Sequence, residues 1–332
     1  MSCLRFTHTY KDIISIENLL LAWKEFLKGK RNRKDVLEFQ RNLMTNILNL
    51  HNDLKNKTYK HADYKAFKIN DPKPRDIHKA TVKDRLLHHL IYNALYLYFD
   101  KKFIYDSYSC RISKGTHKAI YRFESFIRKA SKNNTKQCWV LKCDIRKFFA
   151  NIDHDILKSI LEKYIEDKDI LWLLSNVIDS FSFSDSDKIQ KGLPLGNLTS
   201  QLLVNIYMNE FDQFVKRKLK VKYYIRYADD FVVLSEDRKY LEKILEKIQE
   251  YLKSNLKLEM HPDKVFIKTI YSGVDFLGWV HFGKHKVLRT STKRRMFRNL
   301  KNNQKQETVD SYFGMLKHGN SFKLKGKIMF DK

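Results

Sequence analysis

Residues 221–234 read VKYYIRYADDFVVL. Two runs rich in β-branched and aromatic residues are split by Asp229 and Asp230, which predicts a hairpin with two acids at its tip. An Asp-Asp pair in a hairpin is most often only a turn, because Asp tolerates turn geometry. The interpretation of this pair therefore depends on the segments before and after it.

The segments around the hairpin alternate between strand and helix patterns. Residues 138–143 (CWVLKC) form a short apolar strand candidate that ends at Asp144. Helices are predicted over residues 154–165, 198–219 and 238–255. The order strand, helix, helix, acidic hairpin, helix predicts an α+β sheet domain flanked by helical lobes.

The two ends of the chain are mainly helical in pattern. Apolar residues at helical spacing predict helices over residues 15–28, 34–56 and 82–100. Residues 64–78 contain two prolines and predict a hairpin or loop. The tail from about Lys293 is basic and helical in pattern.

The charge of the chain points to a polyanionic partner. Among 332 residues, Lys and Arg total 65 and Asp and Glu total 38, so the formal net charge is +27. Nucleic acid is the favoured partner and an anionic membrane surface the alternative. A lysine-rich proteome would explain Lys in place of Arg but not the scarcity of acids. The basic segments 28–34 and 293–305 are candidate RNA or partner surfaces.

Composition excludes several classes of protein. With 43% hydrophobic residues, 10 Gly and 4 Pro, global disorder is excluded. No apolar run approaches the roughly 18 residues of a membrane span, and the first residues lack the apolar core of a signal peptide. The four cysteines form no CxxC pair, which favours reduced thiols and a cytoplasmic location.

The three acids of the middle segment support metal chemistry. Asp144 ends a strand, and Asp229 and Asp230 lie between two strands, so their carboxylates can converge. Converging oxygens favour Mg²⁺ or Mn²⁺, and two such ions roughly 4 Å apart would promote phosphoryl transfer. The alternative for Asp144 is that it only caps the segment that follows.

The order of several motifs resembles that of reverse transcriptases. Tyr227-Ala-Asp-Asp230 resembles their YxDD box. Residues 144–149 (DIRKFF) resemble the first palm acid with its aromatic pair, and residues 192–201 (GLPLGNLTSQ) lie where the family has its Gly-rich nucleotide-binding loop and helix. Residues 273–279 (GVDFLGW) resemble the primer-grip hairpin. Segments 75–85 and 107–117 resemble the fingers of bacterial, intron-type enzymes.

The resemblance covers about residues 60–320 and implies a right-hand polymerase. The expected fold class is α+β, with fingers, a palm of antiparallel sheet plus helices, and a helical thumb. The implied division is an N-terminal helical region at 1–60, fingers at 61–135, palm at 136–283 and thumb at 284–332. The implied partners are an RNA template, a DNA or RNA primer with its cDNA, and dNTPs, without a membrane.

The loop sequence is similar to one subfamily. Leu195-Gly196 with Ser200-Gln201 resembles diversity-generating retroelement enzymes, encoded by bacteria or phages. This resemblance implies synthesis that is error-prone at template adenines, and it raises a small basic accessory protein as a further partner. An antiphage defence reverse transcriptase, including one that works without a template, is the alternative within the family. A catalytically silent RNA-binding scaffold is the alternative of another class.

The resemblance also implies roles for individual residues. Two Mg²⁺ ions, with Mn²⁺ as a substitute, would be held by three carboxylates and one main-chain carbonyl, those of Asp144, Asp229, Asp230 and Ile145. The nucleotide would be bound by Lys73, Arg75, Phe149, Leu195, Gly196 and Gln201, and the primer by Phe276, Leu277 and Gly278.

Some of these residues have simpler interpretations that remain open. Phe149 would exclude a 2′-hydroxyl, or it is an ordinary core aromatic residue. Lys264 would be the general acid for pyrophosphate, or it is a surface lysine. Leu195 would loosen base discrimination, or it only packs the loop. His88 and His89 are interpreted as structural residues of an apolar helix rather than as ligands.

Overall fold

The computed structural model describes residues 6–70, 74–183, 190–303 and 305–330, and these residues group into two compact units. The first unit contains residues 1–104, 146–213 and 251–259, and the second contains residues 105–145, 214–250 and 260–332. The chain crosses between the units several times. The division into N-terminal region, fingers, palm and thumb stays a prediction.

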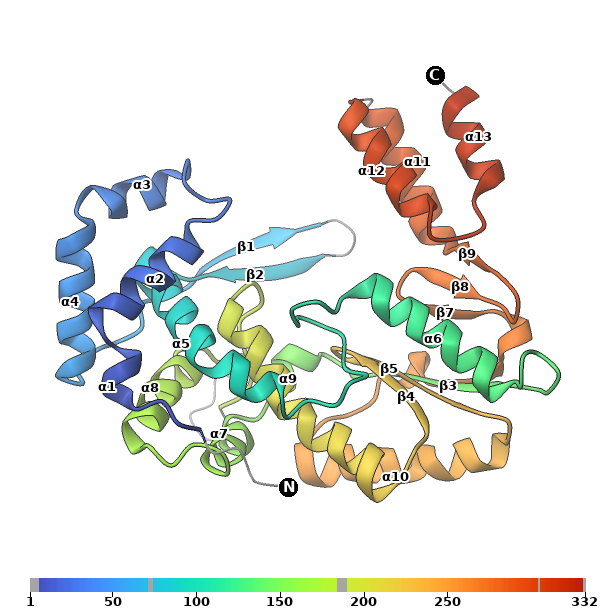
Figure 1. Ribbon diagram of the computed structural model, residues 1–332, viewed down its shortest axis with the longest axis horizontal. Helices are drawn as coiled ribbons and strands as arrows, with labels where there is room; N and C mark the ends of the chain where they lie inside the picture. Colours follow the sequence, from blue (N-terminus) through green and yellow to red (C-terminus); the bar gives the residue numbers. More distant parts are fainter. Residues whose placement is uncertain (1–5, 71–73, 184–189, 304, 331–332) are drawn as a thin grey trace. The chain divides into compact units, whose positions relative to one another are not determined.

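The first unit is mainly helical and carries one two-stranded hairpin (Figure 1). Its elements are α1 (Tyr10–Ile13), α2 (Ile16–Phe26), α3 (Lys34–Arg41), α4 (Leu43–Lys55), β1 (Lys65–Ile69), β2 (Arg75–Lys79), α5 (Val82–Asp100), the 3₁₀ helix η1 (Phe148–Asn151), α7 (His154–Glu162), α8 (Lys168–Asp179) and α9 (Leu198–Gln213).

Helix α5 shows how local signals set the first unit. The side chain of Thr81 accepts a hydrogen bond from the backbone N–H of Asp84 and so caps the helix, which begins at residue 82 as predicted. Its apolar face packs against α2 and α9. Helix α9 is buried on almost every side, as expected for the central helix of a packed unit.

The segment 34–56 differs from the sequence expectation. It forms two helices, α3 and α4, rather than one, because the backbone leaves the helical region at Asn42 (φ −117°, ψ 40°). The N–H of Asn42 still bonds to the carbonyl of Gln40. Only one residue therefore separates the two helices.

The second unit is built on a four-stranded antiparallel sheet in the order β4-β5-β3-β6. The elements of this unit as far as residue 269 are α6 (Thr116–Ala130), β3 (Trp139–Asp144), the π helix η2 (Phe214–Lys218), β4 (Tyr223–Tyr227), β5 (Asp230–Ser235), α10 (Arg238–Leu256), the 3₁₀ helix η3 (Pro262–Lys264) and β6 (Phe266–Thr269). The last turns of α10 belong to the first unit.

Helices α6 and α10 lie on opposite faces of this sheet (Figure 1). The α6 side forms a core that includes Phe123, Val140, Ile225 and Val232. Because side chains alternate along a strand, every second residue of β3 after Val140 points to the α6 face. Lys142 and Asp144 share this face.

A three-stranded sheet and three helices complete the second unit. They are the 3₁₀ helix η4 (Ile270–Ser272), β7 (Val274–Phe276), β8 (Trp279–His281), β9 (Lys286–Leu288), α11 (Thr290–Asn302), α12 (Gln306–Leu316) and α13 (Phe322–Phe330). A core around Trp279, Met296 and Leu316 joins the small sheet to these helices. Among the described residues, no helix is both long and apolar enough to cross a bilayer.

Candidate active site

The acidic hairpin forms as the sequence predicts. Strands β4 and β5 pair antiparallel, and Tyr227 lies opposite Asp230. The turn passes through Ala228, whose φ is 55°, a left-handed conformation that a small side chain tolerates best. Asp229 therefore lies in the turn, and Asp230 is the first residue of β5.

Strand β3 brings the third acid to the same place. Asp144 is the register partner of Asp230, so the two carboxylates leave neighbouring strands on one face. The backbone N–H of Ile145 donates to the carbonyl of Asp229 at 3.2 Å. Ile145 also bridges to Met260, which fixes the chain just beyond Asp144. The structure thus collects Asp144, Asp229 and Asp230 within one unit.

Lys142 is a site residue that the motifs did not reveal. Its ammonium group lies 2.9 Å from both carboxylate oxygens of Asp230, and the two side chains are 9% and 19% exposed. The alternation of β3 carries the clue, because Lys142 lies two residues before Asp144 and shares its face. A lysine inside an otherwise apolar strand is the sequence signal that could have identified Lys142 as a site residue.

A second lysine binds the first acid. The Nζ atom of Lys264 lies 2.8 Å from Oδ1 of Asp144. The 3₁₀ helix η3 carries this lysine, and the N–H of His261 beside it donates to the carbonyl of Asp144 at 2.8 Å. Lys264 is thus part of the acid cluster rather than a distant surface lysine. Its assignment as a general acid stays a prediction.

Burial and like charges affect the electrostatics of Asp230. Burial raises the pKa of Asp230 to about 6, and the negative charges of Asp229 and Asp144 act in the same direction. The ammonium group of Lys142 opposes this rise in pKa. The cluster therefore concentrates negative charge that a cation would stabilise.

The expected nucleotide loop lies in the first unit. The N–H of His78 in β2 donates to the carbonyl of Leu195 at 3.1 Å, and the side chain of Asn197 donates to the carbonyl of His78 at 2.9 Å. Gly196 has φ 102°, and an added Cβ would lie 2.9 Å from the side chain of Ile77. The loop is thereby fixed against the β1–β2 hairpin.

The same loop is joined to the aromatic pair. The N–H of Leu193 donates to the carbonyl of Phe149 at 2.8 Å. Phe148 is buried, whereas the neighbouring Phe149 is only half-buried. The two aromatic residues thus have different environments, with Phe148 in the core and Phe149 at its edge. A role of Phe149 at the nucleotide sugar stays a prediction.

The other residues expected to bind the nucleotide also lie in the first unit, except Lys73, which is outside the described residues. Arg75 is exposed at the start of β2 and has no ion-pair partner among the residues that the structure describes. The side chains of Leu195 and Gln201 are half-buried. The structure thus joins the loop, the hairpin and Phe149 in one unit, and the three acids in the other.

The expected primer-grip turn forms a tight hairpin in the second unit. Leu277 and Gly278 connect β7 to β8 with φ values of 51° and 88°, the pattern of a type I′ turn. Phe276 is fully buried in the core below α6, so its side chain supports the hairpin. A contact between this turn and a primer stays a prediction.

The acid cluster provides the right donors for a divalent ion, although no metal geometry is preformed. In the described part of the chain, no group of three or more His, Cys, Asp and Glu side chains is arranged to hold a metal. Lys142 and Lys264 bind two of the three carboxylates instead. Carboxylate oxygens from adjacent strands are hard ligands, so the residues fit a Mg²⁺-like ion.

Comparison with known proteins decides the family. The sequence profile described as "Reverse transcriptase (RNA-dependent DNA polymerase)" matches residues 67–281, which is more than half of the chain. The chain belongs to the reverse transcriptase family. Reverse transcriptases generally use divalent metal ions, in keeping with the donors just described.

Three curated relatives are similar to this chain over part of their length. "Protein YkfC" of Escherichia coli is 26% identical over 64% of this chain and 62% of that protein. "Group II intron-encoded protein LtrA" of Lactococcus lactis is 22% identical over 82% of this chain and 56% of that protein. The "Putative COX1/OXI3 intron 2 protein" of Saccharomyces cerevisiae is 21% identical over 82% of this chain and 38% of that protein. The chain thus spans between 38% and 62% of the length of these relatives.

Solved structures support the fold class. Apo telomerase from Candida tropicalis, truncated from its C-terminal domain, matches with a TM-score of 0.52 at 12% identity over 74% of this chain and 60% of that chain. Telomerase from Candida albicans with a fragment of telomeric RNA matches with a TM-score of 0.53 at 10% identity, over 71% of this chain and 48% of that chain. The α+β right-hand polymerase fold is therefore confirmed for this reverse transcriptase.

Proposed function

We propose that this chain is an RNA-directed DNA polymerase that makes cDNA on an RNA template. The observation that carries the proposal is the pairing of Asp144 with Asp230 across β3 and β5, with Asp229 in the adjoining turn. A catalytically silent RNA-binding scaffold has no need of three acids on adjacent strands. The net charge of +27 supports binding of a phosphate backbone.

The acids form the proposed reaction centre together with the two lysines. When bound, two Mg²⁺ or Mn²⁺ ions would activate the attacking hydroxyl and stabilise the leaving oxygen. Asp144, Asp229 and Asp230, with the carbonyl of Ile145, are the proposed ligands. Lys264, whose ammonium group lies 2.8 Å from Asp144, is the proposed general acid for departing pyrophosphate.

The first unit supplies the proposed nucleotide contacts. Arg75 is exposed and suits a bidentate contact with a triphosphate, and Lys73 is proposed to assist it. Phe149 would lie under the sugar and select dNTP over rNTP. Leu195, Gly196 and Gln201 would contact the sugar and base from the loop that the β1–β2 hairpin supports.

A role in a diversity-generating retroelement is the proposed biological setting. The loop variant Leu195-Gly196 with Ser200-Gln201 supports it, because leucine offers a contact without the directed hydrogen bonds of glutamine. Errors opposite template adenines, a small basic accessory protein and a cytoplasmic location belong to this proposal. Antiphage defence, with synthesis that needs no template, is the alternative and predicts product in the absence of added RNA.

Primer extension by the Asp229→Asn variant tests the polymerase proposal. We expect dNTP incorporation on an RNA template to be lost while RNA binding and folding are kept, because the substitution removes one negative charge from the proposed metal ligands. Asp237→Asn is the matched control, since Asp237 is exposed and lies beyond the end of β5. Polymerisation by Asp229→Asn at the wild-type rate would overturn the proposal.

A further inference from the structure

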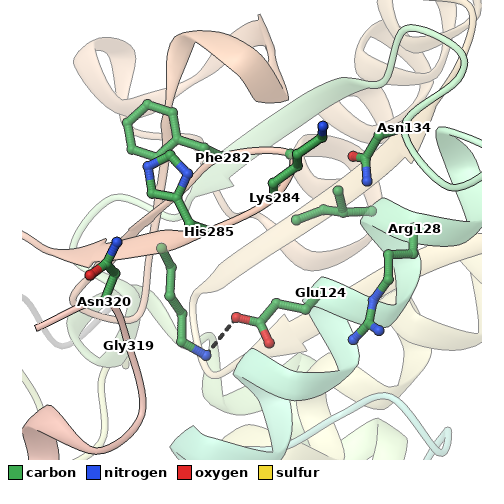
Figure 2. A pocket seen from close by; sticks show the side chains of 11 residues that line it. Glu124, Arg128, Asn134, Phe282, Lys284, His285, Gly319 and Asn320 are labelled. Carbon is green, nitrogen blue, oxygen red and sulfur yellow. Dashed lines mark ion pairs between the residues drawn. The ribbon is translucent and has the colours of Figure 1, made fainter.

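A cavity of about 560 Å³ lies in the second unit, and it is lined by residues from three stretches that are distant in the sequence, 124–134, 282–286 and 319–320 (Figure 2). Helix α6 contributes Glu124 and Arg128, and the turn before β3 contributes Asn134. The β8–β9 turn at residues 282–286 and the turn at Gly319 close the other sides. A volume of this size is in the range of small-molecule sites, which is about 300–1,000 Å³.

The cavity is separate from the proposed reaction centre. Asn134 lies in the turn that leads into β3, and Asp144 lies at the opposite end of this strand. Six residues of extended chain span about 17 Å from first to last. None of the residues that line the cavity has a role in the proposed polymerase reaction.

The charges at the cavity leave an excess of cations. Lys286 and Glu124 form an ion pair of 2.5 Å and neutralise each other. Arg128 and Lys284 have no ion-pair partner among the described residues, and both side chains are exposed at the cavity (Figure 2). The ammonium group of Lys284 and the guanidinium group of Arg128 point in different directions, so each can contact a separate phosphate group (Figure 2).

The β8–β9 turn adds a flat aromatic surface. The rings of Phe282 and His285 stack with centroids 4.8 Å apart and planes inclined by 13°. The N–H of Phe282 donates to the carbonyl of His285 at 2.8 Å, which closes the turn and holds the rings together. His285 is exposed, so its ring is available to a planar ligand group.

A hydrogen-bond acceptor completes the cavity. The side-chain oxygen of Asn134 is buried and has no donor within hydrogen-bond distance in the described structure. A buried polar atom without a partner is unfavourable, so a ligand that supplies an N–H or O–H would stabilise this arrangement. Gly283 lies directly beside it, since an added Cβ would be 2.9 Å from the same oxygen.

We propose that this cavity is a nucleotide-binding site distinct from the polymerase centre. Phosphate groups would bind at Arg128 and at Lys284, the base would stack on the Phe282–His285 pair, and a sugar hydroxyl or base amino group would donate to Asn134. The nucleotide is either free or one unit of a single-stranded nucleic acid, because both carry the same three groups. The proposal does not depend on the chain being an active polymerase.

Photo-crosslinking of the full chain tests the site. One arm uses 8-azido-ATP as a free nucleotide and the other a short single-stranded RNA containing 5-iodouridine, both in EDTA to suppress metal-dependent binding at the acids. Mass spectrometry then maps the crosslinked peptides. We expect crosslinks in the peptide that contains residues 282–285, and the arm that gives them identifies the source of the nucleotide. The absence of this peptide from both arms would overturn the proposal.

Charge variants separate this site from general attraction by a basic protein. The double variant Arg128→Glu, Lys284→Glu should reduce the crosslink at residues 282–285 by about tenfold or more, because it replaces two phosphate contacts by repulsion. The double variant Lys243→Glu, Lys247→Glu on α10 changes the net charge equally at exposed residues outside the cavity. An equal loss in both double variants would overturn the proposal.

A third variant tests the stacking contact and leaves every Asp, Glu, Lys and Arg side chain in place. His285→Ala removes the exposed ring and should weaken the crosslink while the circular dichroism spectrum stays that of the wild type. It also keeps the proposal testable if a charge variant fails to fold. An undiminished crosslink in His285→Ala would contradict stacking on this turn.

Discussion

At the scale of residues, the acid cluster is balanced by two lysines that no motif identified in advance as its partners. Lys142 contacts both oxygens of Asp230, and Lys264 contacts Asp144. Each ammonium group is held where a divalent cation would also be attracted by the same carboxylate. Metal binding is therefore expected to compete with, or rearrange, these ion pairs.

Replacing Lys142 tests this competition. Lys142→Met leaves Asp230 without its cationic partner, so we expect the metal-free protein to lose about 2 kcal/mol of unfolding free energy. Added Mg²⁺ should then raise the melting temperature more in the variant than in the wild type, because the ion replaces the lost charge. Thermal denaturation with and without Mg²⁺ measures both effects.

Lys142→Arg is the matched control, since it keeps the positive charge, and it should stay close to the wild type in both conditions. Equal stabilisation of Lys142→Met and wild type by Mg²⁺ would show that Lys142 and the metal do not share Asp230.

Leu195 carries the second prediction at this scale. Its side chain is only half-buried, while its carbonyl is bound by β2. Leu195→Gln should lower the error frequency by up to about tenfold, because one regained hydrogen bond is worth about 0.5–1.5 kcal/mol and about 1.4 kcal/mol is a factor of ten. Sequencing of cDNA made by both proteins checks this, and identical error spectra would leave Leu195 as a packing residue.

At the scale of elements, helix α5 contains a buried histidine, and we expect this residue to destabilise the folded protein at low pH. His88 is 1% exposed, and its Nε2 lies 3.2 Å from Nε2 of His61. Burial lowers the pKa of His88 to about 3, and the nearby His61 and His89 act in the same direction. This lowered pKa predicts that His88 is neutral in the folded protein near pH 7.

The sign of the resulting pH dependence follows from this lowered pKa. Below about pH 6.5, His88 binds a proton in the unfolded chain but stays neutral in the folded protein. The free energy of unfolding therefore falls as the pH falls. Between about pH 7 and about pH 5 the loss from His88 is about 2 kcal/mol. Urea unfolding of wild type and His88→Gln at both values measures it.

We expect His88→Gln to be less stable than wild type near neutral pH but to lose less stability in acid. His8→Gln, at an exposed position, is the control and should keep the acid dependence of the wild type. An unchanged acid dependence in His88→Gln would contradict the assignment.

At the scale of the whole molecule, the excess of positive charge should dominate the binding of nucleic acid. With a net charge of +27, template affinity is expected to fall steeply with salt as counterions are released. Contacts with about six phosphates would lower the affinity about a thousandfold between about 50 and 200 mM salt. Fluorescence anisotropy of a labelled template across this range measures the slope. A slope near zero would argue against an extended basic binding surface.

Local elements of this protein could be predicted from short stretches of the chain. The turn at Ala228 and Asp229, the helix that begins at residue 82 and the strand that ends at Asp144 depend on residues close together in the chain, so their patterns are visible without a structure. The family follows from the order of such motifs. The break at Asn42 was missed because the amphipathic pattern continues through it.

The tertiary structure alone decided which distant residues meet. Lys142 and Asp230 are 88 positions apart, and Lys264 and Asp144 are 120 positions apart, so no local pattern pairs them. The cavity between α6, the β8–β9 turn and Gly319 likewise exists only after three segments have packed together. Such contacts depend on strand register and on burial of a shared core, and both are properties of the folded chain rather than of any short stretch.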